Sequence, residues 1–156
     1  MQSMIISKRI TLKPVKLTNK FKKHIIKQLE TETDEECSKL YGYILKIHSI
    51  EKITCYEDTI LLVDFLADTL KPEVGQEIKA TVFKIYKDGL FVDILDKQKI
   101  LVPSVNINDY EFNEENDTYI HTKDSNKVIK ENDPVKVRID AVKYNNAKFS
   151  CFGSLV

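Results

Sequence analysis

Apolar and polar positions change their spacing along the first half of the chain, and each spacing predicts a different element. Residues 4–12 are rich in β-branched side chains, which favours a strand. Residues 21–30 repeat apolar side chains at helical spacing with lysines between them, which predicts a short amphipathic helix. Apolar residues on both faces of 41–53 predict a central strand, and 59–66 predicts a second strand that pairs with it across the loop 54–58.

The second half of the chain has the alternating pattern of an all-β domain. Pro72 and Gly75 come just before the alternation begins and mark a domain boundary. Asp88-Gly89 is a hairpin signal, and Asn145-Asn146 joins the last two alternating runs. Five strands are predicted, at residues 77–86, 90–95, 97–102, 135–144 and 147–153. Such strands fit a small OB-type barrel, and the polar insert 106–131 between them is expected to be exposed.

Together the two halves predict an α+β fold with two domains. Residues 1–74 form a strand-helix-strand-strand domain, and residues 75–156 form a five-stranded antiparallel OB-fold β-barrel. A length of 156 residues is sufficient for two small domains.

Charge is balanced over the chain but not along it. Lys and Arg number 24, as do Asp and Glu, so any contact with RNA is expected to be local and weak. Between Lys8 and Lys27 the sequence holds basic residues and no acid, whereas 30–36 is acidic. Such neighbouring patches suit docking to a protein or to a nucleic acid. A solvated helix face followed by a solvated loop explains them equally well.

Several classes of chemistry are not expected. Cys37, Cys55 and Cys151 have no paired spacing, which argues against a disulfide framework or a zinc site and for a reducing compartment. No apolar run approaches the ~20 residues that span a bilayer, and no signal core is present at the N-terminus. The sequence has no phosphate-binding glycine loop and no nucleophile motif, so we expect neither an enzyme nor a metal site.

An OB barrel binds single strands by stacking bases on exposed aromatic side chains and by contacting phosphates with lysine or arginine. The aromatic candidates are Tyr86, Phe91 and Tyr144. The basic candidates around them are Lys84, Lys87, Lys99, Arg138 and Lys143. Phe91 is equally compatible with a place in the core, and single lysines are commonly no more than solvated surface.

The first domain holds the candidates for a protein partner. Consecutive apolar residues in a strand point to opposite faces, so Phe65 and Leu66 cannot both lie in the core of a one-sided sheet. An apolar residue on the second face needs a cover, which favours a constitutive partner, although a two-layer fold could also provide it. The partner-binding candidates are Tyr41, Tyr43, Phe65, Leu70 and Pro72.

Several segments, in collinear order over nearly the whole chain, carry a resemblance to one family. They are Leu40–Ile44, Ile50–Ile53, Lys71–Ile78, Ala80–Val82, Lys87–Val92, Val102–Ser104, Tyr110–Asn113, Val135–Ile139 and Phe149–Leu155. The set resembles the seventh-subunit family of RNA polymerase II, whose archaeal counterpart is the larger stalk subunit. The loop 54–58 is shorter than in that family, and the chain stops early, as in a reduced version from a compact eukaryote or a large DNA virus.

The resemblance implies a non-catalytic stalk subunit without a cofactor. Its first domain would be a small α/β sandwich that docks on the large polymerase subunits and on a helical partner of the fourth-subunit type. Its barrel would contact nascent single-stranded RNA. The setting would be the nucleus, or the host cytoplasm and virion. Two alternatives stay open: a free-standing OB-fold RNA-binding or translation factor, and a structural assembly protein whose barrel no longer binds RNA.

Overall fold

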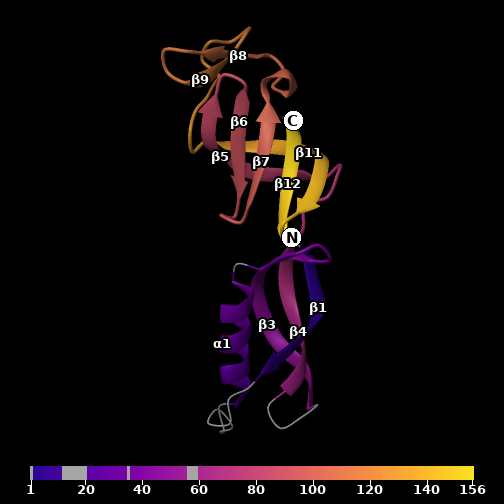
Figure 1. Cartoon of the computed structure of the whole chain (residues 1–156). Helices are drawn as coiled ribbons and strands as arrows, with labels where there is room; N and C mark the ends of the chain where they lie inside the picture. Colours follow the sequence, from indigo (N-terminus) through magenta and orange to yellow (C-terminus); the bar gives the residue numbers. More distant parts are fainter. Residues whose placement is uncertain (1, 12–20, 35, 56–59) are drawn as a thin grey trace. The chain divides into compact units, whose positions relative to one another are not determined.

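The computed structural model describes residues 2–11, 21–34, 36–55 and 60–156 and divides into two compact units, Met1–Lys71 and Pro72–Val156 (Figure 1). Strands hold 63% of the described residues and helices 11%. The predicted α+β class is therefore wrong, because the described chain is mostly β with one α-helix, α1 (Phe21–Thr33). The predicted loop 54–58 lies largely outside the described residues.

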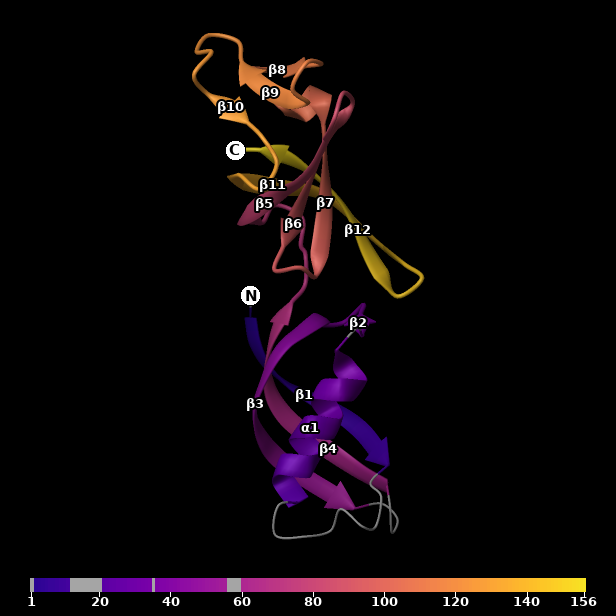
Figure 2. The same cartoon turned by 90° about the vertical axis from the view of Figure 1, so that its left-hand side faces the viewer.

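Unit 1 is one antiparallel sheet with α1 on one of its faces (Figures 1 and 2). The strand order is β1 (Gln2–Thr11), β4 (Ile60–Leu70), β3 (Gly42–Cys55) and β2 (Cys37–Ser38). The expected sandwich is thus a single sheet with a single helix. β3 lies between β4 and β2 and is an interior strand, as predicted, although β2 pairs with only its first two residues.

The core of unit 1 lies between α1 and the sheet. Ile25 and Leu29 of the helix are fully buried against the inward side chains of the strands, including Phe65. Burying a side chain of this size stabilises the fold by about 1.5–3 kcal/mol. Three β-bulges in β3 shift its register beyond Ile44, Ile47 and Ile50, and an isoleucine therefore returns to the core at every third position.

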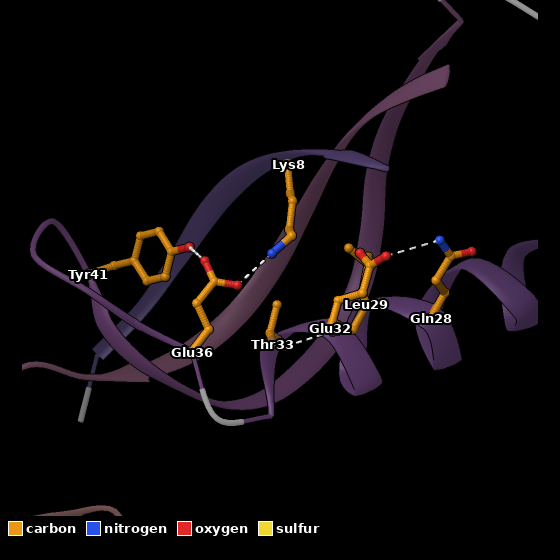
Figure 3. A network of polar contacts seen from close by, with 7 residues as sticks. All are labelled: Lys8, Gln28, Leu29, Glu32, Thr33, Glu36 and Tyr41. Carbon is orange, nitrogen blue, oxygen red and sulfur yellow. Dashed lines mark hydrogen bonds and ion pairs between the residues drawn. The ribbon is translucent and has the colours of Figure 1, made fainter. Parts of the chain in front are cut away.

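The polar contacts that follow the helix connect its C-terminal end to the sheet (Figure 3). The carboxylate of Glu36 accepts a hydrogen bond from Lys8 Nζ at 2.5 Å and another from the Tyr41 hydroxyl at 3.3 Å. Within the last turn, Thr33 Oγ1 donates to the carbonyl of Leu29 at 2.7 Å. One charge of the basic run, that of Lys8, is therefore neutralised inside unit 1.

Most of the expected partner-binding side chains serve the fold itself. Phe65 and Leu70 are 0% and 1% exposed, and Pro72 is also buried, so these three offer no surface to a partner. The helix covers the face of β4 that holds Phe65, which is the internal cover that a two-layer fold supplies. Tyr41 and Tyr43 are partly exposed, and the Tyr41 hydroxyl is bonded to Glu36 as described above.

Unit 2 contains the predicted OB-like barrel. Its strands are β5 (Glu77–Tyr86), β6 (Gly89–Ile94), β7 (Gln98–Pro103), β11 (Pro134–Asn145) and β12 (Lys148–Leu155). They close in the order β11-β12-β7-β6-β5, with β5 paired to β11. The expected all-antiparallel pairing is wrong at one place, because β7 and β12 run parallel. The interior is filled by Val82, Leu90, Val92, Ile100, Val102, Val137 and Ile139, all of them fully buried.

The polar insert is mostly exposed, as predicted, and it also forms secondary structure of its own. After the short 3-10 turn η2 (Ser104–Asn106), β8 (Tyr110–Asn113), β9 (Thr118–His121) and β10 (Val128–Ile129) form a three-stranded sheet (Figure 2). Tyr119 is only 2% exposed. Ile107 and Ile129 of the insert are also buried, and Ile129 pairs with Tyr119 across β10 and β9. A few apolar residues within a polar segment are enough to give the insert a small core.

Candidate nucleic-acid interface

The outward side of β5 and β6 carries a group of aromatic side chains. Phe83 and Tyr86 on β5 are 51% and 48% exposed, and Phe91 on β6 is half-buried. The rings of Tyr86 and Phe91 meet edge to face, with centroids 6.1 Å apart and planes at 87°. We call Phe83, Tyr86 and Phe91 the aromatic face.

A β-bulge in β5 turns these side chains to the same side. Val82 pairs with Val92, but Lys84 pairs with Phe91, so β5 has one extra residue at this point. Strict alternation from Val82 would turn Lys84 and Tyr86 inward. Because of the bulge, Ile85 is buried instead, and Lys84 and Tyr86 are exposed beside Phe83.

Three lysines lie on or beside the aromatic face. Lys99 on β7 places its Nζ 4.5 Å from the centre of the Phe83 ring, within the range of a cation–π contact. Lys84 is exposed and is the cross-strand neighbour of Phe91. Lys87, in the turn between β5 and β6, forms an ion pair with Glu114 at 3.7 Å. Because the side chains of Lys87 and Glu114 are both largely exposed, their ion pair is weak. Lys87 is therefore able to leave Glu114 for a phosphate.

The insert supports the turn that carries Lys87. The Tyr119 hydroxyl lies 2.7 Å from the carbonyl oxygen of Tyr86 and 3.1 Å from that of Lys87, and it donates to them. Burial, and to a lesser degree the charge of Asp88, raises the pKa of Tyr119, so the hydroxyl keeps its proton. Gly89 is required by close packing, because a Cβ there would lie 2.5 Å from the carbonyl oxygen of Val102.

One acidic side chain shares this side of the barrel. Asp93 on β6 pairs across the strands with Thr81 and with Lys99. Its Oδ2 accepts a hydrogen bond from the amide of Asp96 at 2.9 Å, whereas its buried Oδ1 has no hydrogen-bond partner among the described residues. Burial is the main cause that raises the pKa of Asp93. When ionised, this carboxylate opposes a phosphate near Lys99.

The other predicted RNA-binding residues lie on a different pair of strands. Arg138 on β11 is held by Asp140, with 3.0 Å between Nε and Oδ1. The hydroxyl of Ser154 also donates to Asp140 and, with Arg138, lowers its pKa. Lys143 and Tyr144 lie on the hairpin of β11 and β12, where the Tyr144 ring packs on Phe149 with 4.9 Å between centroids. The structure thus brings Lys84, Tyr86, Lys87, Phe91 and Lys99 together on β5–β7 and places the remaining three on β11.

Sequence reasoning missed two residues of the site. Phe83 could have been found from the alternating pattern of its strand. Ala80 and Val82 are buried, so the next residue, Phe83, is expected to point outward. Tyr119 could not have been found from the sequence, because its contact with the β5–β6 turn depends on how the insert folds back onto the barrel. Among the described residues, no group of His, Cys, Asp and Glu is arranged to hold a metal ion. Nor does any helix in the described ranges have the length and apolar character to cross a bilayer.

Residues 71–151 match the family model described as S1 RNA binding domain. The chain belongs to this family. The matched range holds the whole aromatic face, the insert and most of the barrel. No curated protein matches the chain.

Two solved structures are similar to part of this S1 chain. One is the apo form of Mycoplasma genitalium RNase R, with a TM-score of 0.43. The other is Mycoplasma genitalium RNase R in complex with ribose methylated single-stranded RNA, with a TM-score of 0.45. Each is 17% identical over 53% of this chain, and the chain spans 13% of the length of either.

The S1 match overturns the resemblance to the polymerase seventh-subunit family. Segments such as Lys87–Val92 are not specific to the polymerase family, because a hairpin with a glycine followed by an aromatic residue occurs in many RNA-binding OB domains. A stalk role in transcription, polymerase subunits as partners and a nuclear or virion setting drawn from that role are not supported. RNA as the partner is supported. The absence of catalysis and the place of the protein in a cell stay predictions.

Proposed function

We propose that this S1 protein binds single-stranded RNA through the aromatic face, and that it acts as a binding protein rather than as an enzyme. The observation that carries the proposal is the aromatic face, in which the Tyr86 and Phe91 rings are in contact and Phe83 is exposed beside them on the bulged strand β5. Exposure of apolar rings to water is unfavourable unless a ligand covers them, and nucleobases are flat partners of matching size.

Each part of the site has a role in this proposal. Unpaired bases stack on the rings, each contributing about 1–3 kcal/mol, while Lys84 and Lys99 contact the phosphates between them. Base pairing would hide the faces that stack, so the site favours single strands over duplexes. Asp93 and the zero net charge of the chain limit the attraction to phosphate, so binding is expected to be weak and sensitive to salt.

The test is the affinity of the full chain for a fluorescein-labelled single-stranded RNA, measured by fluorescence anisotropy at low salt. Tyr86→Leu and Phe91→Leu remove a ring but keep an apolar side chain, so the barrel should stay folded. Loss of one stacked base should weaken binding about tenfold. Leu40→Ala serves as the control, because this apolar side chain is exposed in unit 1, outside the barrel.

Tyr144→Leu tests the second group of predicted residues with the same RNA. Because Tyr144 packs on Phe149 rather than on the aromatic face, its replacement should change the affinity less than that of Phe91. If Tyr86→Leu and Phe91→Leu both bind RNA as tightly as the unaltered chain, the aromatic face is not the RNA site.

A further inference from the structure

Phe152 on β12 is an exposed aromatic side chain outside the aromatic face. It is 46% exposed, whereas its neighbours Cys151 and Gly153 are buried, so its ring points outward from the barrel. Exposure of a single apolar residue is common and implies nothing by itself. The position of Phe152 in the sheet is more informative.

The strand register aligns Phe152 with the aromatic face. Phe91 pairs across the strands with Leu101, and Leu101 pairs across the parallel strands with Phe152. Register partners point to the same side of a sheet. The three side chains therefore form one outward row across β6, β7 and β12, with the half-buried Leu101 between the two rings.

The spacing of the row assigns the rings to different bases. Neighbouring strands lie about 4.8 Å apart, so Phe91 and Phe152 are separated by roughly 10 Å, two such spacings. That is too far for both rings to stack on one base. Gly153 allows β12 to lie close to β11, because a Cβ there would lie 2.7 Å from the carbonyl oxygen of Arg138.

We infer that Phe152 is a further base-stacking residue, and that the RNA-binding surface continues from the aromatic face across Leu101 onto β12. This inference rests on the proposed function and specifies its ligand: an unpaired RNA segment that crosses β6, β7 and β12. A protein partner would need a continuous apolar area, but the next outward residues of β12 on either side of Phe152 are Ser150 and Ser154. The apolar row is therefore one side chain wide along β12, which suits bases stacked along the row rather than a broad protein interface.

The inference is tested with a length series of unstructured single-stranded RNAs, from about 4 to about 16 nucleotides, the range of site sizes of OB folds. Affinity is measured for the unaltered chain, Phe152→Leu, Phe152→Tyr and the control Leu40→Ala in unit 1, and thermal unfolding checks that each is folded. Phe152→Leu should bind the shortest RNA normally and the longer RNAs about tenfold more weakly. Phe152→Tyr, which keeps a ring, should restore most of that loss.

Three results would overturn the inference. If Phe152→Leu binds all lengths normally while Phe91→Leu does not, the surface ends at the aromatic face and the proposed function stands. If neither substitution affects RNA binding, the proposed function fails as well. If Phe152→Leu weakens binding equally at every length, Phe152 belongs to the same subsite as Phe91 or acts on the fold, and no additional base is held on β12.

Discussion

The hydroxyl of Tyr119 donates a hydrogen bond to the main-chain carbonyl of Tyr86, with 2.7 Å between the two oxygens. Tyr119 belongs to β9 of the insert, and Tyr86 is the last residue of β5. A side chain far along the sequence therefore holds the strand end that carries part of the aromatic face. The insert therefore helps to hold the candidate RNA site in place.

Replacing Tyr119 with Phe should loosen this connection. The change leaves the ring buried but removes the donor to Tyr86 and Lys87, which should lower the free energy of unfolding by about 1 kcal/mol. Urea unfolding measures this change, and RNA affinity should fall with it. Tyr110→Phe is the matched control, because the structure gives the Tyr110 ring a contact with His121 but no hydrogen bond of its hydroxyl among the described residues. Equal stability of the two variants would show that the insert does not secure the turn.

Asp93 should make the barrel less stable as pH rises. Its pKa in the folded protein is raised above the usual 3.8, so between these two values the folded state binds more protons than the unfolded state. The stability that Asp93 contributes is therefore present below pH 3.8 and is lost as the pH rises through the pKa of the folded protein. Relative to Asp93→Asn, the unaltered protein should lose stability across this window, as measured by urea unfolding at a series of pH values.

Asp140 provides the opposite case and serves as the comparison. Its pKa is lowered from 3.8, first by the hydrogen bond from Ser154 and then by that from Arg138. Its contribution is therefore present above 3.8 and is lost as pH falls through the folded pKa. The stability difference between the unaltered chain and Asp140→Asn should change with pH in the reverse direction to that for Asp93→Asn. The same direction for both would contradict the account of Asp93.

Salt dependence should reveal which lysines contact phosphate. For single strands the slope of log K against log salt changes by about 0.7 for each phosphate neutralised. Lys84→Gln and Lys99→Gln should each lower the slope by about that amount. Arg138→Gln should change it less, because Arg138 is already held by Asp140. Lys39→Gln, an exposed lysine of unit 1, is the control for loss of charge alone. Equal slopes for Lys39→Gln and Lys84→Gln would show that Lys84 does not contact the RNA.

The charges of α1 oppose its dipole at both ends. The first turn holds no acid and includes Lys22, whereas the last turn holds no base and includes Glu30 and Glu32. Lys22→Glu should therefore stabilise the helix by about 0.3–1 kcal/mol. Thermal unfolding at low salt measures the gain, and Lys39→Glu, outside the helix, should give none. If both substitutions have the same effect, net charge rather than the helix dipole is responsible.

Local signals in the sequence predicted the barrel strands well. The expected strand 77–86 coincides with β5, because regular alternation and the Asp88-Gly89 turn are both contained in a short stretch of chain. The parallel pairing of β7 with β12 has no such local signal, since it joins residues about fifty positions apart. The bulges of β3 also escaped prediction, because isoleucines at every third position match neither a strand nor a helix.

The site was predicted only in part, because only some of its residues are marked by local sequence signals. Phe91 and Tyr86 flank the turn and were found from the hairpin pattern, with Lys84, Lys87 and Lys99 close to them in sequence. Arg138, Lys143 and Tyr144 were assigned to the same surface on composition alone, whereas β11 places them elsewhere. Phe152 requires the register of three strands before it can be recognised. The family was misassigned because its barrel motifs are shared by many OB domains.

Closure of the barrel by β12 has a consequence for how the protein is made. Both β7 and β11 take β12 as a neighbour, and β12 follows every other barrel strand in the chain. A nascent chain therefore cannot complete the barrel until residues 148–155 have left the ribosomal tunnel. The sheet of unit 1 needs no strand beyond Leu70 and is free to fold during elongation, at about 5–20 residues per second. The S1 half, which we propose binds RNA, is therefore the later of the two to complete its fold.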